Sequence, residues 1–422
     1  ILMKNLLTPI ALAAGLLCGT AAHAELELHG YFRTQAGTTS EGGNLQCFNP
    51  GWPASGAGDR AVGRLGNECD NYGELNAALG FGDPNDVWGK YHLSMSYKPD
   101  QAGSYEPVNS TMKDGQLVSP ATELANRENY FEAGGFFPKG AFENSTLWVG
   151  KRYYNRDDIH ILDQYYLDNT GTGAGVQGID LGGAKASVAY LQAGKQGSED
   201  GLTATKRYAF KIYDIAANKD AKLESELTLI RGSSAANTPV GSGYTLSVQH
   251  NQSGVMGGFN KLALVLGKDT GAGFLWTPVY SGNGTGDKGN SSWRIHEQFF
   301  FDLKGTKWSG MVAATAGQID DGGNKPSFQN VVIRPQYNVN NNFSVAFELG
   351  HAQGKNGASK PQMTKFTIAP QLALSPGFWA RPVLRAFVTH ANWNADAGTQ
   401  ANGAFGTKTS GTTLGFQAEA WW

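Results

Sequence analysis

Segments of about ten residues in which apolar and polar side chains alternate recur along this 422-residue chain. In residues 26–36, Leu26 and Leu28 fall on one face of an extended segment, while Glu27 and His29 fall on the other. A period of two residues indicates a β-strand whose two faces meet different surroundings. The pattern therefore predicts an all-β fold. The same alternation occurs in residues 72–81, 87–97, 343–349 and 413–422.

Two all-β architectures fit this alternation. In a soluble β-sandwich the apolar faces point to the core, whereas in a membrane barrel they face lipid around a polar lumen. A sandwich of about 400 residues divides into domains joined by linkers, but no Pro/Ser-rich linker and no change of composition interrupts this chain. The sequence therefore favours one antiparallel transmembrane β-barrel domain over residues 25–422.

Composition excludes several other classes. Lys and Arg number 34 against 36 Asp and Glu, so the formal net charge of −2 provides no cationic surplus for nucleic acid. Aromatic residues make up 11% of the chain, which is too many for a disordered protein. The 57 glycines show no three-residue period and suit the many turns of a β-protein. No stretch has the 18 consecutive apolar residues typical of a transmembrane helix.

The first 24 residues have the features of a secretory signal peptide. Lys4 precedes a mostly apolar stretch over residues 6–20, and residues 22–24 form an A-x-A cleavage pattern. The apolar stretch is shorter than the roughly 20 residues that a spanning helix needs. We expect an exported chain whose mature part is residues 25–422.

The mature part contains two cysteines, Cys47 and Cys69, in one Gly/Asn/Pro-rich stretch between two strand-like segments. A single disulfide is the expected state of such a pair in an oxidising compartment. A metal site using both thiols is the alternative, but no C-x-x-C pair and no nearby histidine pair accompanies them. We therefore predict a disulfide and no metal.

Residues 413–422 form a last strand-like segment. Leu414, Phe416 and Trp422 share one face, and Trp421 lies on the other. A final strand that ends on an aromatic residue is similar to the C-terminal signature of outer-membrane barrels, in which Trp422 would join the interfacial aromatic girdle. Trp421 would then point into the lumen.

Aromatic and charged residues share the polar face of several segments. Tyr31 lies on the same face as Arg33, and Tyr72 on the same face as Glu74. Sugars suit such a wall, because a pyranose rests its C–H face on an aromatic ring while its hydroxyls bond to Arg and carboxylate groups. These aromatics could instead fill the wall or form the girdles of the barrel. Further sets on one face are Phe259 with Lys261, and Trp379 with Arg381 and Arg385.

Collinear short strings along the mature chain resemble the maltoporin family. Together they extend from the first strand-like segment to the last residue. They are H-G-Y-F-R at 29–33, Q-C-F at 46–48, R-L-G-N-E-C at 64–69, G-K-R-Y-Y at 150–154, D-I-H at 158–160, G-A-G at 173–175, G-F-N-K at 258–261, W-A-R-P at 379–382 and W-W at 421–422.

The resemblance implies an 18-stranded antiparallel barrel, assembled as a homotrimer in the lipid of the Gram-negative outer membrane. It implies passive, selective diffusion of maltose and maltodextrins along an aromatic slide in the channel. That slide includes a tryptophan from a neighbouring subunit, for which Tyr105 is the candidate here. The positions that match the slide are Tyr31, Tyr72, Phe259, Trp379 and Trp421.

The resemblance also implies a polar track that faces the slide. Residues 154–168 match the constriction loop that folds into the lumen, and Tyr165 matches the tyrosine that narrows the channel. The positions that match the track are Arg33, Arg64, Glu74, Arg127, Arg156, Asp163 and Tyr165.

Catalysis has little support in the sequence. Asp157, Asp158, His160 and Asp163 could bind a metal or act as acid and base, but no further His or Cys motif accompanies them, and a hydrogen-bonded loop is the favoured interpretation. No H-E-x-x-H or G-x-S-x-G motif occurs. We predict no enzyme, no cofactor and no metal site. The alternatives are a porin for another oligosaccharide, a non-specific porin, and a hydrolase or adhesin built on a barrel.

Overall fold

The computed structural model describes most of the chain from residue 25 onward. The predicted signal peptide, residues 1–24, and Tyr105 lie outside the described residues. The described ranges are 25–58, 60–99, 112–113, 116–117, 122–193, 203–234, 241–273, 288–397 and 403–422.

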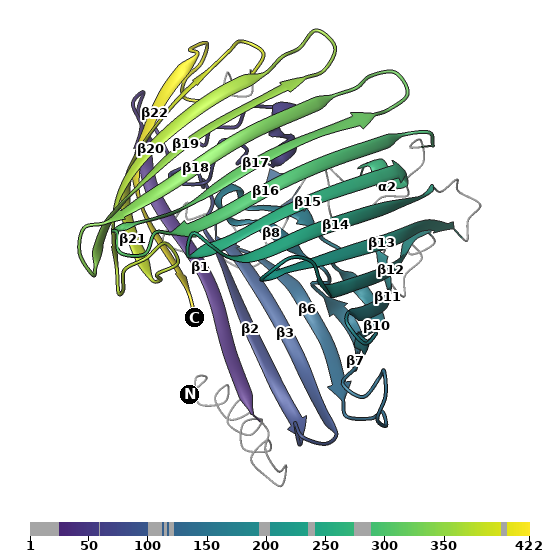
Figure 1. Ribbon diagram of the computed structural model, residues 1–422. Helices are drawn as coiled ribbons and strands as arrows, with labels where there is room; N and C mark the ends of the chain where they lie inside the picture. The colour runs from purple at the N-terminus through teal and green to yellow at the C-terminus, as the bar shows by residue number, and fades with distance from the viewer. Residues whose placement is uncertain are drawn as a thin grey trace.

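Eighteen strands of the described residues form one antiparallel sheet, in which each strand pairs with its neighbours along the chain. The first strand, β1 (Leu26–Thr39), also pairs with the last, β22 (Ser410–Trp421), so the sheet closes into a barrel (Figure 1). The predicted fold class is thus confirmed. The other strands of the barrel are β2 (Tyr72–Gly82), β3 (Trp88–Pro99), β6 (Thr122–Gly134), β7 (Thr146–Arg152), β10 (Gly171–Asp180), β11 (Lys185–Ala193), β12 (Thr203–Ala216), β13 (Ala221–Ser234), β14 (Ser242–Val255), β15 (Gly258–Asp269), β16 (Ser291–Asp302), β17 (Trp308–Asp320), β18 (Ser327–Asn338), β19 (Phe343–Lys355), β20 (Gln362–Ala373) and β21 (Val383–Trp393).

A few short elements lie outside this sheet. Two small hairpins pair β4 (Met112–Lys113) with β5 (Gln116–Leu117), and β8 (Asp157–Ile159) with β9 (Gln164–Leu167). The helical turns are η1 (Ala54–Ala57), η2 (His160–Leu162) and α2 (Thr270–Gly273). No helix in the described part of the chain is long and apolar enough to cross a membrane.

The two ends of the barrel differ in their connections. Short connections such as residues 256–257 and 303–307 join strands at one end, here called the turn end. The start of β1 and the end of β22 also lie at the turn end, where the backbones of Gly30 and Trp422 exchange two hydrogen bonds of 3.2 Å. Longer connections, including residues 40–71 and 153–170, leave the opposite end, here called the loop end.

The barrel has its apolar side chains outside and its polar ones inside. In β22, Leu414 and Phe416 are exposed on the outer surface, whereas Gln417 and Glu419 are buried. A soluble sandwich would show the reverse. Since exposed apolar side chains are costly in water but stable in lipid, the outer surface is a membrane-facing one. This observation decides between the two architectures that the alternation left open.

Two segments from the loop end fold into the lumen. One is the constriction loop, residues 153–170, which carries β8, η2 and β9 inside the barrel (Figure 1). The other is the first loop, residues 40–71, where Phe48, Ala61 and Val62 are fully buried. The resemblance predicted that the constriction loop folds into the barrel. The alternation pattern did not predict that the first loop does so as well.

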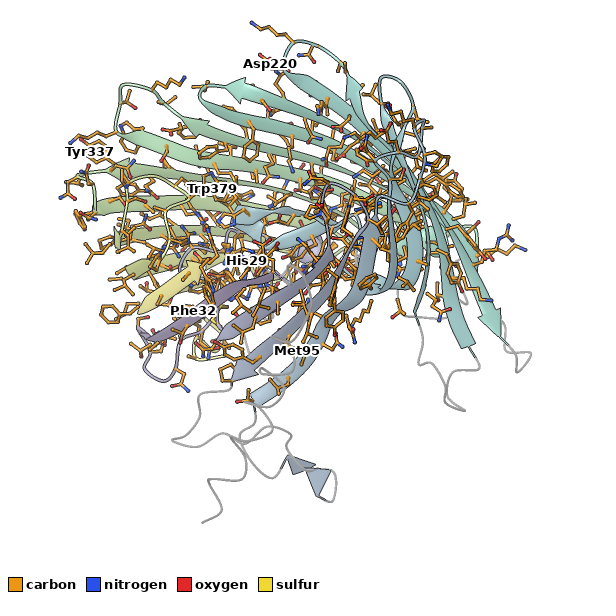
Figure 2. The ribbon with its side chains drawn as sticks, turned by 90° about the horizontal axis from the view of Figure 1, so that it is seen from below. His29, Phe32, Met95, Asp220, Tyr337 and Trp379 are labelled. Atoms are coloured by element: carbon orange, nitrogen blue, oxygen red, sulfur yellow. A yellow bond between two sulfur atoms is a disulfide. The ribbon has the colours of Figure 1, made fainter. Side chains whose placement is uncertain are left out.

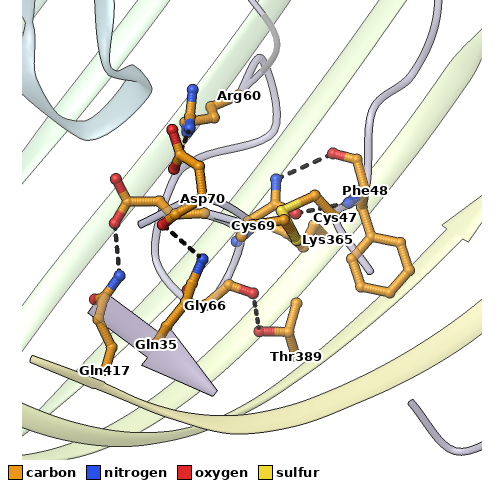
Figure 3. The surroundings of a disulfide bond; sticks show 12 residues. Gln35, Cys47, Phe48, Arg60, Gly66, Cys69, Asp70, Lys365, Thr389 and Gln417 are labelled. Carbon is orange, nitrogen blue, oxygen red and sulfur yellow. Dashed lines mark hydrogen bonds and ion pairs between the residues drawn. A yellow bond between two sulfur atoms is a disulfide. The ribbon is translucent and has the colours of Figure 1, made fainter. Parts of the chain in front are cut away.

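The first loop binds to the inner wall of β19, β20 and β21. The Lys365 ammonium donates to the carbonyl of Leu65 at 2.9 Å, and the Thr389 hydroxyl donates to that of Gly66 at 3.1 Å (Figure 3). Gly66 has a positive φ of 58°, and a Cβ there would lie 2.3 Å from the Thr389 hydroxyl, so only glycine fits this close approach. The loop is thereby held flat against the wall.

The predicted disulfide closes this loop. Cys47 and Cys69 are bonded, with their Cα atoms 5.7 Å apart (Figure 3). Beside the bond, the Asn67 amide accepts from the backbone of Phe48 at 2.7 Å and donates to its carbonyl at 3.0 Å. The two ends of the loop are thus joined covalently and by hydrogen bonds, next to Glu68 of the lumen.

Candidate functional site: the channel lining

Aromatic rings from distant strands meet near the turn end of the lumen. The Trp379 ring lies 5.5 Å from that of Phe300, which lies 5.6 Å from Phe259. On the other side, the His160 ring of the constriction loop lies 4.8 Å from Trp379 and 6.1 Å from Trp421. Three of the five expected slide residues therefore belong to one chain of ring contacts.

The remaining two rings form a second group. Tyr31 and Tyr72 have ring centroids 6.2 Å apart. Tyr31 is also the cross-strand partner of Trp421, because β1 pairs with β22 in that register. The second group therefore continues from the first along the wall, and all five residues lie on the lumen side.

Trp379 faces the lumen, but its orientation is not set by the alternation of side chains along a strand. The sequence interpretation placed Trp379 and Arg381 on a strand face with Arg385, but β21 begins only at Val383. Both residues lie in the connection between β20 and β21, and Figure 2 labels Trp379 there. This connection turns inward, so that the buried Phe378 ring packs 4.9 Å from the Trp379 ring. That interpretation was wrong for these two residues, although the lumen-facing orientation holds.

A buried ionic network lies beside the rings, centred on Glu419 of β22. Arg381 contacts the Glu419 carboxylate at 2.7 Å, and its guanidinium lies 4.0 Å from the centre of the Trp421 ring. Arg385 and Arg64 bind the same carboxylate at 3.0 and 2.9 Å. The network therefore fixes an aromatic ring and three cations in one place.

Arg33 and Arg64 are held inside this network. Arg33 pairs with Glu68, Asp70 and Asp163, each at 2.9 Å. Arg64 pairs with Glu68 at 2.6 Å and donates to the Tyr31 hydroxyl at 3.1 Å. Both arginine side chains are less than a tenth exposed. Their guanidinium groups are therefore positioned to orient neighbouring side chains, and little of either group is accessible from the channel.

The constriction loop is attached to this network through Asp163. Burial raises the pKa of Asp163, but Arg64, Arg33 and Arg60 outweigh that effect and hold the pKa well below its ordinary value. The carboxylate is therefore charged at neutral pH. Its backbone is left-handed, with φ 48°, at the end of η2. Arg33 thus ties the middle of the constriction loop to β1.

A more open polar group lies around Glu74 of β2. Its carboxylate accepts hydrogen bonds from the hydroxyls of Tyr72 and of Tyr153, the latter at 3.1 Å. Arg127 lies 3.7 Å from the same carboxylate and donates to Tyr153. About a third of the Arg127 side chain is exposed. The group presents charge-assisted donors and acceptors beside Tyr72, one of the expected slide residues.

Arg156 and Tyr165 form the remaining part of the expected track. The Arg156 guanidinium lies 3.5 Å from the centre of the Tyr165 ring and 4.0 Å from that of Tyr153. It also pairs with Asp168 at 3.3 Å. All three are partners within or beside the constriction loop, so the tyrosine is held in a defined position inside the lumen.

Three of the four residues that could have formed a metal or acid/base cluster point to different partners. Asp157 pairs with Lys261 at 3.6 Å, Asp163 with Arg33, and His160 lies among the rings. Burial, followed by Arg64, lowers the pKa of His160 well below its ordinary value, so the ring is neutral. Within the described residues, no group of three or more His, Cys, Asp or Glu side chains could hold a metal ion.

Several residues of the lining were not found from the sequence. Phe300 contacts the rings of Trp379 and Phe259, yet it lies in the run Phe299-Phe300-Phe301, where three consecutive rings hide the alternation. Glu226 of β13 accepts from both Asn155 and Asn169, one at each end of the constriction loop. Polar residues alternating at 224, 226 and 228 were the available signal for Glu226.

A closed barrel with an apolar outer face, a polar lumen and two loops folded inside defines a channel of the outer-membrane porin class. The model of the LamB porin family matches residues 26–422. The chain belongs to this family, and it is therefore a multi-pass β-barrel of the Gram-negative outer membrane and a channel, not an enzyme.

Individual proteins agree with this assignment. The chain is 31% identical to the maltoporin of Hahella chejuensis (strain KCTC 2396) over 443 residues, covering 98% of this chain and 97% of the relative. Two solved structures share the fold at 10% identity and a TM-score of 0.50: Pseudomonas aeruginosa OpdK with vanillate, covering 94% of this chain and 99% of OpdK, and Acinetobacter baumannii OccAB2, covering 95% and 98%.

Proposed function

We propose that this porin mediates facilitated diffusion of maltose and maltodextrins along its aromatic rings. The observation that carries the proposal is the series of ring contacts that runs from Trp421 through His160, Trp379 and Phe300 to Phe259, with Arg381 and Glu419 beside it. An α-linked glucan offers apolar C–H faces to such rings and hydroxyls to such ions. The maltoporin relative supports the same substrate class.

Binding at each position has to be weak for sugar to move. A ring stacked on a pyranose contributes about 1 kcal/mol, by analogy with aromatic pairs. Each hydrogen bond to a charged partner contributes roughly 1.5–3 kcal/mol, partly offset by the water that it displaces. Several weak positions in a row let the sugar exchange one ring and one partner at a time. Conduction requires this balance between entry and release.

The assignment of roles follows the geometry. Tyr31, Tyr72, Phe259, Trp379 and Trp421 are proposed to hold the apolar face of the sugar, with Phe300 as a sixth ring. Glu74, Arg127 and Arg156 are proposed to bond its hydroxyls, and Tyr165 to narrow the channel opposite the rings. Arg33, Arg64 and Asp163 are proposed to keep the rings and the constriction loop in place.

Replacing Trp379 with alanine should weaken maltodextrin block of single-channel current about five- to ten-fold, with nearly unchanged ion conductance, because the loss removes roughly 1 kcal/mol of stacking but no charge. Trp308→Ala is the matched control, since Trp308 is similarly exposed but lies on the outer surface beside Tyr337. Equal maltodextrin block in wild type and Trp379→Ala would contradict the aromatic slide and favour a non-specific porin.

The functional unit is proposed to be a homotrimer of independent channels. The family assignment supports it, as does the apolar outer face around β1 and β20–β22, where Leu372, Leu384 and Phe416 are more than half exposed. Native mass measurement of the detergent-solubilised protein should give three times the mass of one chain. A monomer alone would contradict the assembly while leaving the sugar track of each barrel to be tested separately.

A further inference from the structure

Two cations face each other on the outer surface of the barrel, near the loop end. Lys206 of β12 and Arg231 of β13 are direct cross-strand partners. Both lie on the lipid-facing side, because the residues two positions along each strand, Tyr208 and Leu229, are exposed outer-surface residues. Like charges directly opposite each other on a sheet are destabilising, so this pair is best accommodated by an anion.

The surroundings of this pair differ from those of lysines at the other end of the barrel. Within the described part of the chain, no carboxylate pairs with Lys206 or Arg231. At the turn end, by contrast, Lys222 and Lys185 both pair with Asp214, at 2.6 and 3.6 Å. The cross-strand neighbours of the cation pair are uncharged, Gln192 on β11 and Ser242 on β14. Among the described residues, therefore, nothing neutralises the positive charge that the pair presents on the outer surface of the barrel.

Two residues along the strands from this pair, toward the turn end, the outer surface carries a row of aromatic side chains. Tyr190, Tyr208 and Tyr244 face outward there, and the Tyr190 and Tyr208 rings are 5.5 Å apart. Outward-facing tyrosines mark the level where lipid headgroups meet acyl chains. The next row down is apolar, with Phe210 and Leu227 exposed. The cation pair thus lies at headgroup height, above surface that suits acyl chains.

The longer loops of outer-membrane barrels are extracellular, so the loop end lies at the outer leaflet. We propose that Lys206 and Arg231 form a binding site for the phosphate of a phosphorylated glycolipid in that leaflet. Arg supplies a planar fork of donors and Lys a point charge, the two modes in which proteins bind phosphate. The acyl chains of the same molecule lie along Phe210 and Leu227. A lipid fits better than an acidic protein segment, because a single lipid accounts for both the charge and the apolar surface beneath it.

The test is native mass spectrometry of the full protein in detergent with bis-phosphorylated lipid A. Lys206→Gln/Arg231→Gln should lower the affinity for the lipid about thirty-fold, since each basic residue near a membrane surface contributes a factor of about five to six. Lys206→Arg should bind as wild type does. The matched control is Lys219→Gln/Lys304→Gln, which removes two exposed lysines from turns at the other end and should change nothing.

Two further arms identify what the site recognises. Lipid A stripped of both phosphates should bind wild type and the double variant equally weakly, and inorganic phosphate should fail to displace lipid A. The proposal is overturned if the dephosphorylated lipid binds as well as lipid A, if free phosphate displaces it, or if the double variant and the turn-end control behave alike. Binding of an acidic peptide in preference to lipid A would equally overturn it.

Discussion

Replacing Arg64 with alanine is expected to lower the free energy of unfolding by about 3–5 kcal/mol, because it leaves buried carboxylates without a partner. The Arg64 guanidinium lies 2.6 Å from Glu68 and 2.9 Å from Glu419, and all three side chains are less than a tenth exposed. Burial lowers the pKa of Arg64, but Glu68 and Glu419 outweigh this and raise it well above its ordinary value. The cation is therefore permanently charged.

Maltodextrin block should fall in the same variant. Arg64 lies in the first loop and donates to the hydroxyl of Tyr31, one of the proposed slide residues, at 3.1 Å. Its loss should therefore free the Tyr31 ring and loosen the first loop. Thermal unfolding in detergent measures the first effect and single-channel block the second. Lys325→Ala is the control, because it breaks an exposed ion pair with Asp320 at 2.9 Å, and such pairs contribute little. An Arg64→Ala protein as stable as the control would show that the network does not hold the loop.

Glu74→Gln is expected to weaken maltodextrin binding about ten-fold or more while preserving the barrel. The change keeps the size of the side chain but removes the charge that accepts from Tyr72 and Tyr153 and faces Arg127. A hydrogen bond to a charged group contributes roughly 1.5–3 kcal/mol, and 1.4 kcal/mol corresponds to a factor of ten. The sugar loses such an acceptor, and Tyr72 loses the group that orients it.

A matched control exists on β6, which is separated from β2 by β3. Glu132 of β6 has the same side-chain exposure as Glu74, 16%, but it pairs with His92 at 2.9 Å, away from the ring contacts. Glu132→Gln should therefore leave sugar block unchanged. If both glutamate variants lose sugar block equally, the effect reflects the overall charge of the lumen and not a sugar-binding group at Glu74.

The sequence predicted those parts of the molecule that a strand period encodes. Tyr31, Tyr72 and Trp421 face the lumen because lumen and lipid impose opposite demands on alternate residues of β1, β2 and β22. Cys47 and Cys69 bond as expected. The resemblance predicted a lumen-facing Trp379, but the reason for that orientation could not be read from a strand period, because this residue lies in an inward-folded connection.

The interior packing of the first loop could not be predicted in the same way. Its close contacts depend on Gly66 approaching Thr389 and on Lys365 reaching the Leu65 carbonyl, partners that are 323 and 300 residues apart in the chain. Local sequence gives no sign of such contacts. Likewise, the role of Glu226 follows only from its meeting Asn155 and Asn169 at the two ends of the constriction loop.

The central claim is that the lumen binds an α-glucan along a row of rings, and the most direct measurement is current block by maltodextrins of increasing length. Wild-type channels should show block that saturates with concentration, with an affinity that rises from maltose to maltohexaose, because each added glucose finds a further ring. Block that stays linear in sugar concentration and does not depend on chain length would contradict the claim and leave a non-specific porin.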